Sequence, residues 1–208
     1  MNVITTVDLL RHGLPVGGEI FRGSTDVPLS DEGFVQMRAA VAKLHNSCSG
    51  AKSHEWQQII SSPLQRCSVF AQEIAAAQGV VTLIDNDLRE MSFGDWDGQT
   101  LAAVKAHSAG LFANFWRDPI EHTPPNAEPM AQFCQRVSAA FWQNVLAYKG
   151  QSLLMVAHGG VIRAILGEVL QSPAASLLRY DVPYASISRI HIYHEGDRYY
   201  PQLVFHNR

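Results

Sequence analysis

The sequence predicts an α/β fold, a three-layer sandwich in which a mostly parallel central sheet is flanked by helices and ends in antiparallel edge strands. Short apolar runs alternate with longer amphipathic runs along the 208 residues, which is typical of strands followed by crossover helices. Two alternating segments near the end, 187–193 and 199–205, flank a Glu195-Gly196-Asp197 turn and predict the antiparallel hairpin. The length suits one well-packed domain, 1–208, and is short for two.

The order of the elements follows from periodicity and from the residues that begin and end helices. Ser30 suits the N-cap of the first helix, Pro63 the first position of the second helix, and Gly79 its C-terminus. Gly110 is expected to divide a helix at 101–116, and residues 99–127 are expected to form a small helical cap over the strand ends. The expected strands are 3–10, 56–60, 80–84, 153–157, 187–193 and 199–205, and the remaining helices are 28–46, 129–148 and 161–170.

The composition indicates a folded protein without an excess of positive charge. Hydrophobic residues make up 47% and charged residues 17%, and the net charge of −3 argues against a nucleic-acid partner. No stretch approaches the ~18 uninterrupted apolar residues of a membrane span. The apolar start is interrupted by Asp8 and lacks the features of a signal peptide. We therefore expect a cytoplasmic protein with no membrane partner.

The cysteines and histidines predict neither a disulfide framework nor a metal site. Cys48, Cys67 and Cys134 are odd in number and lack CxxC spacing, so free thiols in a reducing compartment are expected. The nine histidines form no HxH or HxxH cluster near the ends of the predicted parallel strands. A metal-dependent hydrolase is therefore the weaker alternative, and no metal or cofactor is expected.

Reactive side chains follow three of the predicted strands. The first strand ends at Arg11-His12-Gly13, the second at Ser61-Ser62-Pro63-Leu64-Gln65-Arg66, and the fourth at His158-Gly159-Gly160. In open α/β sheets, ligands bind outside the carboxyl ends of the strands, near helix N-termini that favour anions. Two histidines and two arginines that meet there predict a compact cationic pocket.

Five ordered blocks of this chain resemble the histidine phosphatase superfamily, the phosphoglycerate-mutase-like proteins. The resemblance runs from about residue 3 to residue 170, and it implies a phosphoglycerate-mutase-like fold. Arg-His-Gly alone is common by chance, whereas five blocks in the family's order are highly specific. The blocks are Arg11-His12-Gly13, Thr25-Asp26-Val27-Pro28-Leu29-Ser30, Ser61-Ser62-Pro63-Leu64-Gln65-Arg66, Leu88-Arg89-Glu90-Met91-Ser92-Phe93-Gly94-Asp95-Trp96-Asp97-Gly98 and Ala157-His158-Gly159-Gly160.

The resemblance implies a role for each reactive side chain, and the chemistry of the side chains agrees with it. His12 would attack phosphorus through one ring nitrogen and form a phosphohistidine, and its other nitrogen is expected to be bound to a backbone carbonyl. Arg11 and Arg66 would hold the phosphoryl oxygens as planar, bidentate donors, and His158 would donate a hydrogen bond to the same oxygens. Glu90 would protonate the leaving oxygen and then accept a proton from the attacking water.

Three further residues border the expected pocket, and the sequence leaves their roles open. Arg22 is either a substrate contact or a solvated loop arginine. Gly159, directly after His158, is a candidate substrate contact. Glu128 stands where many relatives have a Gly-Gly-Glu-Ser run, but an acidic residue at the start of a helix explains it equally well.

Departures from the mutases of the family favour water as the phosphoryl acceptor. The loop 14–22 lacks the polar Asn of the mutases, and the segment between Glu90 and His158 is short. The loop around Gly17-Gly18 and the blocks 22–26 and 91–98 resemble the α-ribazole phosphatases, which remove the 5′-phosphate of α-ribazole phosphate or its cobamide form in cobalamin biosynthesis. A sugar or nucleotide phosphatase, a mutase and a non-catalytic binder remain alternatives. The expected partner is a small phosphorylated substrate, and a homodimer is compatible with the chain.

Overall fold

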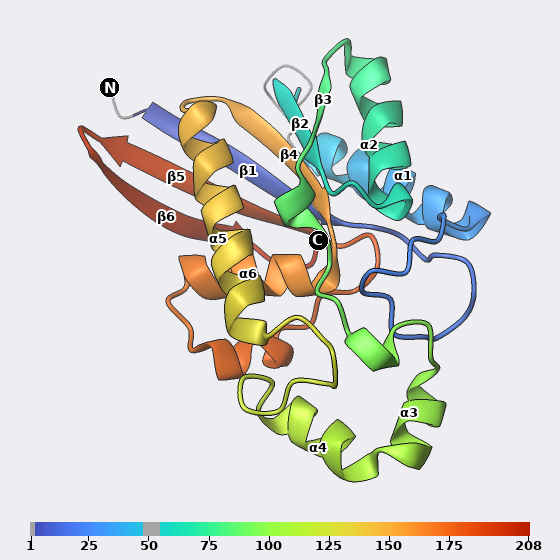
Figure 1. The fold of residues 1–208 in the computed structure, drawn as a ribbon. Coiled ribbons are helices and arrows are strands. Elements are labelled where there is room, and N and C mark those ends of the chain that lie inside the picture. Colours follow the sequence, from blue (N-terminus) through green and yellow to red (C-terminus); the bar gives the residue numbers. More distant parts are fainter. Residues whose placement is uncertain (1–2, 48–54) are drawn as a thin grey trace.

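The computed structural model describes residues 3–47 and 55–208, and a mixed sheet runs through its centre (Figure 1). The strand order within these residues is β3-β2-β4-β1-β5-β6. The pairs β3–β2, β2–β4 and β4–β1 are parallel, whereas β5 pairs antiparallel with both β1 and β6. The predicted mostly parallel sheet with an antiparallel hairpin at its edge is therefore confirmed. The strands are β1 (Val3–Arg11), β2 (Gln58–Ser61), β3 (Thr82–Ile84), β4 (Ser152–Ala157), β5 (Ile187–Glu195) and β6 (Arg198–Phe205).

Helices cover both faces of the sheet and make the three layers that the sequence predicts. The helices α1 (Asp31–Ser47) and α2 (Gln65–Gln78) pack on one face, and α5 (Met130–Ala147) and α6 (Gly159–Val169) pack on the other. Because side chains alternate along a strand, β4 sends Leu153 and Met155 toward α5 and α6, and Leu154 and Val156 toward α1 and α2. Both faces of β4 are thus buried, as a central parallel strand requires.

The carboxyl ends of three neighbouring strands meet at one edge of the sheet. In the register of the sheet, Arg11 of β1 lies opposite Ala157 of β4, and Ser61 of β2 lies opposite Val156. The residues that follow each strand are therefore brought side by side. The common placement that the sequence predicts for its reactive side chains is confirmed.

The helix boundaries differ from the sequence prediction by up to three residues, and two of the differences are informative. The helix α2 begins at Gln65 rather than Pro63, and the side chain that binds its first amide comes from another segment: Asp26 Oδ1 accepts from Gln65 N at 2.8 Å. The two helical pieces predicted around Gly110 are present, but the break lies at Ser108: α3 (Leu101–His107) ends just before it, and Gly110 lies inside α4 (Ala109–Arg117). Three short 3-10 helices complete the described elements, at Asn86–Leu88, Gly94–Trp96 and Ala174–Arg179.

The remaining helix signals hold. Ser30 Oγ accepts from Gly33 N at 3.0 Å as an N-cap, and Gly79 ends α2 with a φ of 69°. In Figure 1, α3 and α4 lie apart from the sheet, beyond the carboxyl ends of its strands. Whether residues 99–127 act as a separate cap stays a prediction.

The structure tests the expectations of free cysteines and of no membrane-spanning segment. Cys67 and Cys134 are free, and Cys48 lies outside the described residues. Burial raises the pKa of both described thiols, that of Cys134 to about 11, which disfavours the reactive thiolate form. None of the helices in the described ranges combines the length and the apolar character that crossing a membrane requires.

Candidate active site

A cavity of about 200 Å³ opens where β1 and β4 end, and it contains most of the side chains that the sequence singles out. Its polar lining comes from five segments that are far apart in the chain, at 11–12, 22, 90, 159–163 and 184, and the rest of the lining is apolar. Of the predicted site residues, His158 and Arg66 lie behind the cavity wall rather than in it. The lining residues are Arg11, His12, Ile20, Phe21, Arg22, Glu90, Phe93, Leu101, Trp116, Gly159, Arg163 and Tyr184.

The imidazole of His12 is held in one tautomer. Its Nδ1 lies 2.8 Å from the carbonyl oxygen of Gly13, and because a carbonyl only accepts, Nδ1 carries the proton. The predicted backbone acceptor is confirmed, and the lone pair is left on Nε2. Burial, and then the positive charges of Arg66 and Arg11, hold the pKa of His12 well below its usual 6.5. The ring is therefore neutral at neutral pH.

His158 stands next to His12, and both of its ring nitrogens are bound within the protein. The two rings are 5.2 Å apart between centroids and meet edge to face. Nδ1 accepts from Arg66 Nε at 3.2 Å, so the proton is on Nε2, which donates to Ser62 Oγ at 2.7 Å. The predicted donation from His158 to a phosphoryl oxygen thus requires this ring to exchange Ser62 for the substrate.

Arg66 is fully buried and holds a neighbouring loop. Besides His158, its guanidinium donates to the carbonyl oxygens of Thr25 at 2.8 Å, Arg22 at 3.0 Å and Gly23 at 3.1 Å. Four of its five N–H groups are used in this way, so the bidentate fork predicted for phosphate is not free in this structure. Arg66 instead fixes the loop that carries Arg22.

Arg11 and Arg22 carry the unsatisfied donors of the cavity. The Nε of each is buried and has no hydrogen-bond partner among the described residues. Arg11 donates through Nη1 to Val182 O and lies 4.1 Å from the ring centroid of Tyr184, and Arg22 donates to Val16 O at 2.9 Å. Since buried polar groups in native proteins are almost always paired, two orphaned cationic donors in one cavity indicate a place for an anion.

Glu90 faces the same cavity from the loop after β3, and backbone amides hold its carboxylate. Oε2 accepts from Gly160 N at 3.0 Å, and Oε1 accepts from Met91 N at 3.1 Å. A Cβ on Gly160 would lie 2.3 Å from Oε1, so only glycine allows this approach. The second glycine of the His158-Gly159-Gly160 block therefore positions the carboxylate that the sequence assigned to proton transfer.

Sequence reasoning missed three residues of the site. Ser62 belongs to a recognised block, but its bond to His158 could not be read from it. Arg163 lies one turn after Gly159 on α6, so helical spacing could have placed it at the cavity. Tyr184 comes from a loop with no motif, and nothing local predicts its place over Arg11.

Comparison with known proteins assigns the family. The profile of the Histidine phosphatase superfamily (branch 1) matches residues 7–202. The chain belongs to the histidine phosphatase superfamily. Proteins of this family act as phosphatases on small phosphorylated substrates, which agrees with the anion site above.

Relatives of this histidine phosphatase differ in the substrate that they are named for. It is 31% identical to "Putative phosphoserine phosphatase 2" of Hydrogenobacter thermophilus, over 96% of this chain and 94% of that protein. It is 28% identical to an adenosylcobalamin/alpha-ribazole phosphatase of Salmonella typhimurium, over 88% and 89%. The structure of a mycobacterial glucosyl-3-phosphoglycerate phosphatase superposes with a TM-score of 0.83 at 26% identity, over 98% of this chain and 99% of the other.

The apolar wall of the phosphatase cavity is aromatic and continues inward. Phe21, Phe93 and Trp116 line the cavity together with its arginines, and Trp116 is 45% exposed. A smaller cavity of about 90 Å³ adjoins this wall and adds Phe115 and Phe133. The site therefore offers an aromatic surface next to the place for an anion.

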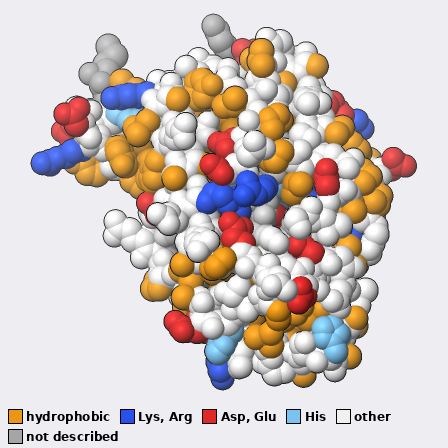
Figure 2. Space-filling model, in the orientation of Figure 1, with side chains coloured by type: hydrophobic (Ala, Val, Ile, Leu, Met, Phe, Trp, Pro, Cys, Tyr) orange, Lys and Arg blue, Asp and Glu red, His pale blue; other side chains and the backbone are white. Residues whose placement is uncertain are grey.

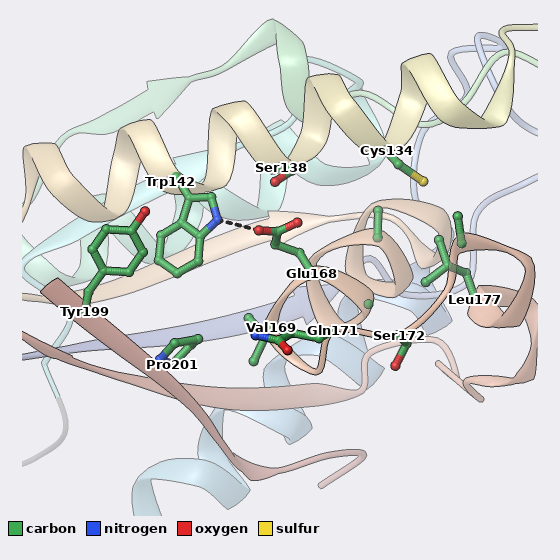
Figure 3. Close-up of a pocket in the computed structure, with 13 residues that line it drawn as sticks. Cys134, Ser138, Trp142, Glu168, Val169, Gln171, Ser172, Leu177, Tyr199 and Pro201 are labelled. Carbon is green, nitrogen blue, oxygen red and sulfur yellow. Dashed lines mark hydrogen bonds between the residues drawn. The ribbon is translucent and has the colours of Figure 1, made fainter.

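A larger groove, of about 440 Å³, lies between α5, α6 and β6 (Figure 3). Trp142 stacks near Tyr199 there and donates to Glu168 Oε1 at 3.0 Å. None of the residues that the sequence assigned to chemistry lines this groove. Within the described ranges, no group of three His, Cys, Asp or Glu side chains is placed to hold a metal ion.

The two buried histidines make the stability of the fold depend on pH. Burial and the arginines lower the pKa of both His12 and His158. In the unfolded chain both titrate near 6.5, so the unfolded state binds more protons below that pH, and stability falls as the pH falls. We expect the free energy of unfolding to begin to fall as the pH passes through 6.5 and to fall more steeply below it, as each histidine takes up a proton in the unfolded chain only. Urea unfolding between pH 7 and pH 5.5 measures it, and His12→Ala should remove its share; equal slopes in both proteins would contradict the assignment.

Proposed function

We propose that this chain is a phosphomonoester hydrolase that uses His12 as a nucleophile and passes through a phosphohistidine. The observation that carries the proposal is the state of His12: neutral, with its lone pair on Nε2, in a cavity that also holds the unpaired Nε groups of Arg11 and Arg22. A histidine in this state can attack phosphorus without first losing a proton. The arginines would meet the negative charge of the phosphoryl oxygens.

The proposed reaction has two steps that share one carboxyl group. In the first, Nε2 of His12 forms a bond to phosphorus while the ester P–O bond breaks, and protonated Glu90 gives its proton to the leaving oxygen. In the second, Glu90 takes a proton from water, the water oxygen bonds to phosphorus, and the P–N bond breaks. His12 and Glu90 are then restored. Because guanidinium groups supply the positive charge, neither step calls for a metal ion.

For the substrate, we propose α-ribazole 5′-phosphate or its cobamide form. Two features support it besides the motif blocks around Gly17-Gly18 and 91–98. The aromatic wall formed by Phe21, Phe93 and Trp116 suits a flat, apolar base, since aromatic surfaces pack well against one another. A relative that is 28% identical over most of both chains is named for this activity.

Arg163 favours a second candidate, a phosphomonoester with a carboxylate on the leaving group. Its Nε donates to Tyr180 O at 2.9 Å, which aims the guanidinium along the cavity wall. A Cβ on Gly159 would lie 3.0 Å from Arg163 Nη1, so this group reaches the cavity beside Gly159. A phosphorylated hydroxy acid or amino acid such as phosphoserine could pair its carboxylate with Arg163.

A turnover screen of the purified protein tests both the reaction and the substrate. The panel contains α-ribazole 5′-phosphate, phosphoserine, glucosyl-3-phosphoglycerate, and simple sugar and nucleotide phosphates, each assayed with EDTA present. We expect the highest kcat/KM for α-ribazole 5′-phosphate. A preference for phosphoserine would select the second candidate. Loss of all turnover in EDTA that added metal restores would overturn the phosphohistidine mechanism.

A further inference from the structure

An ion pair lies behind Glu90, outside the cavity. The Glu128 carboxylate accepts from Arg136 Nε at 2.9 Å and from Nη2 at 2.7 Å, as a bidentate pair between the start of α5 and its second turn. The two side chains are only 19% and 12% exposed. Figure 2 shows basic and acidic side chains side by side near the centre of the face that α5 crosses in Figure 1.

The pair is bonded to the backbone on both sides of Glu90. Arg136 Nη1 donates to the carbonyl oxygens of Asp87 at 2.6 Å and Arg89 at 3.1 Å. The backbone N–H of Glu128 donates to Ser92 O at 3.0 Å. The segment that carries Glu90 is thus tied to one rigid ion pair before and after the residue.

The same unit also reaches the amide that holds the Glu90 carboxylate. The Arg136 guanidinium lies 5.1 Å from the ring centroid of Phe133, and that ring would be 3.3 Å from a Cβ on Gly160. Gly160 N is the donor to Glu90 Oε2. Arg136 thus binds the backbone next to Glu90 directly, and it packs on the Phe133 ring that lies against Gly160, although Arg136 does not line the cavity.

We propose that Glu128 and Arg136 are positioning residues for proton transfer by Glu90, an inference that rests on the proposed function. Both Glu128 oxygens are engaged by Arg136, which speaks for this role and against a substrate contact. Proton transfer needs heavy atoms within hydrogen-bond reach, so a small displacement of the segment slows it. The side chains of Arg11 and Arg22, which would bind the phosphoryl group, donate to carbonyl oxygens outside this segment, those of Val182, Val16 and Gly18.

Substrates with different leaving groups distinguish a positioning role of Glu128 and Arg136 from a merely structural one. The oxygen of an alkyl phosphate is a poor leaving group that needs an acid, whereas p-nitrophenolate leaves without one. The value of kcat/KM reports phosphoryl transfer to His12 rather than later hydrolysis. For Glu128→Gln and Arg136→Gln, we expect kcat/KM to fall about tenfold or more for the alkyl phosphate hydrolysed best in the panel, and less than about threefold for p-nitrophenyl phosphate.

Two comparisons make the test decisive. Glu73→Gln breaks a bidentate pair of the same geometry, which Arg38 and Glu73 form between α1 and α2. It should leave kcat/KM unchanged for both substrates. In a Glu90→Gln background, Arg136→Gln should cause no further fall in kcat/KM for the alkyl phosphate. The effects of two substitutions that act through one group are not additive. Thermal melts check the fold, and Arg136→Lys, which keeps the charge without the fork, replaces Arg136→Gln if that variant unfolds; it should show the same pattern more weakly.

The outcomes distinguish the inference from the function beneath it. The positioning role is wrong if Glu90→Gln selectively lowers kcat/KM for the alkyl phosphate whereas Glu128→Gln and Arg136→Lys do not. Equal losses for both substrates in these variants would also overturn it. If Glu90→Gln itself shows no dependence on the leaving group, the proposed acid is wrong instead.

Discussion

Replacing His12 with alanine is expected to abolish turnover, by about 10⁴-fold or more, and to abolish formation of a phosphoenzyme. The imidazole supplies the only proposed attacking atom, and its lone pair is directed by the bond from Nδ1 to Gly13 O. The arginines that would bind the phosphoryl group stay in place, so phosphate should still bind. Turnover is measured with the best substrate of the panel, and the phosphoenzyme by labelling with radioactive substrate and quenching in alkali, which preserves the P–N bond.

His191→Asn is the matched control, because His191 lies on β5 away from the cavity. This variant should keep both turnover and label. Label that persists in His12→Ala would place the nucleophile elsewhere. If the native protein turns over substrate but no phosphoenzyme label forms, direct attack by water is favoured.

Glu90→Gln is expected to slow turnover of an alkyl phosphate by about 10²–10⁴-fold, the usual contribution of a positioned acid or base. Glutamine retains an oxygen for the Gly160 amide but cannot exchange the proton. Phosphate affinity should be unchanged or tighter, since a negative charge beside the anion is removed. Steady-state kinetics and a binding titration with inorganic phosphate measure the two quantities.

Asp95→Asn serves as the control for Glu90→Gln. Asp95 is exposed, lies in the 3-10 helix Gly94–Trp96 of the same block, and accepts from Asn126 at 2.9 Å. Its replacement should leave turnover within about twofold, as for most surface substitutions. If Glu90→Gln weakens phosphate binding as much as it slows turnover, Glu90 binds substrate and does not transfer the proton.

The order of layers and the place of the site could be predicted because they depend on local patterns. The apolar run before Arg11 and the run before His158 each read as a buried strand, and parallel strands bring their carboxyl ends to one edge. The tautomer of His12 could also be anticipated, since its acceptor is the adjacent residue, Gly13. The start of α2 at Gln65 could not, because the amide of Gln65 is bound by Asp26, which is 39 residues away in the chain.

By itself, the sequence determined the mostly parallel sheet and the set of reactive residues, including His12, Arg11 and Glu90, at one end of it. The tertiary structure alone decided which guanidinium donors are bound within the protein: Arg66 donates to the loop that carries Arg22, whereas the Nε groups of Arg11 and Arg22 have no hydrogen-bond partner among the described residues. It also brought Arg136 behind Glu90. Periodicity encodes which face of an element is buried, whereas hydrogen bonds between distant segments form only once packing has set their distances.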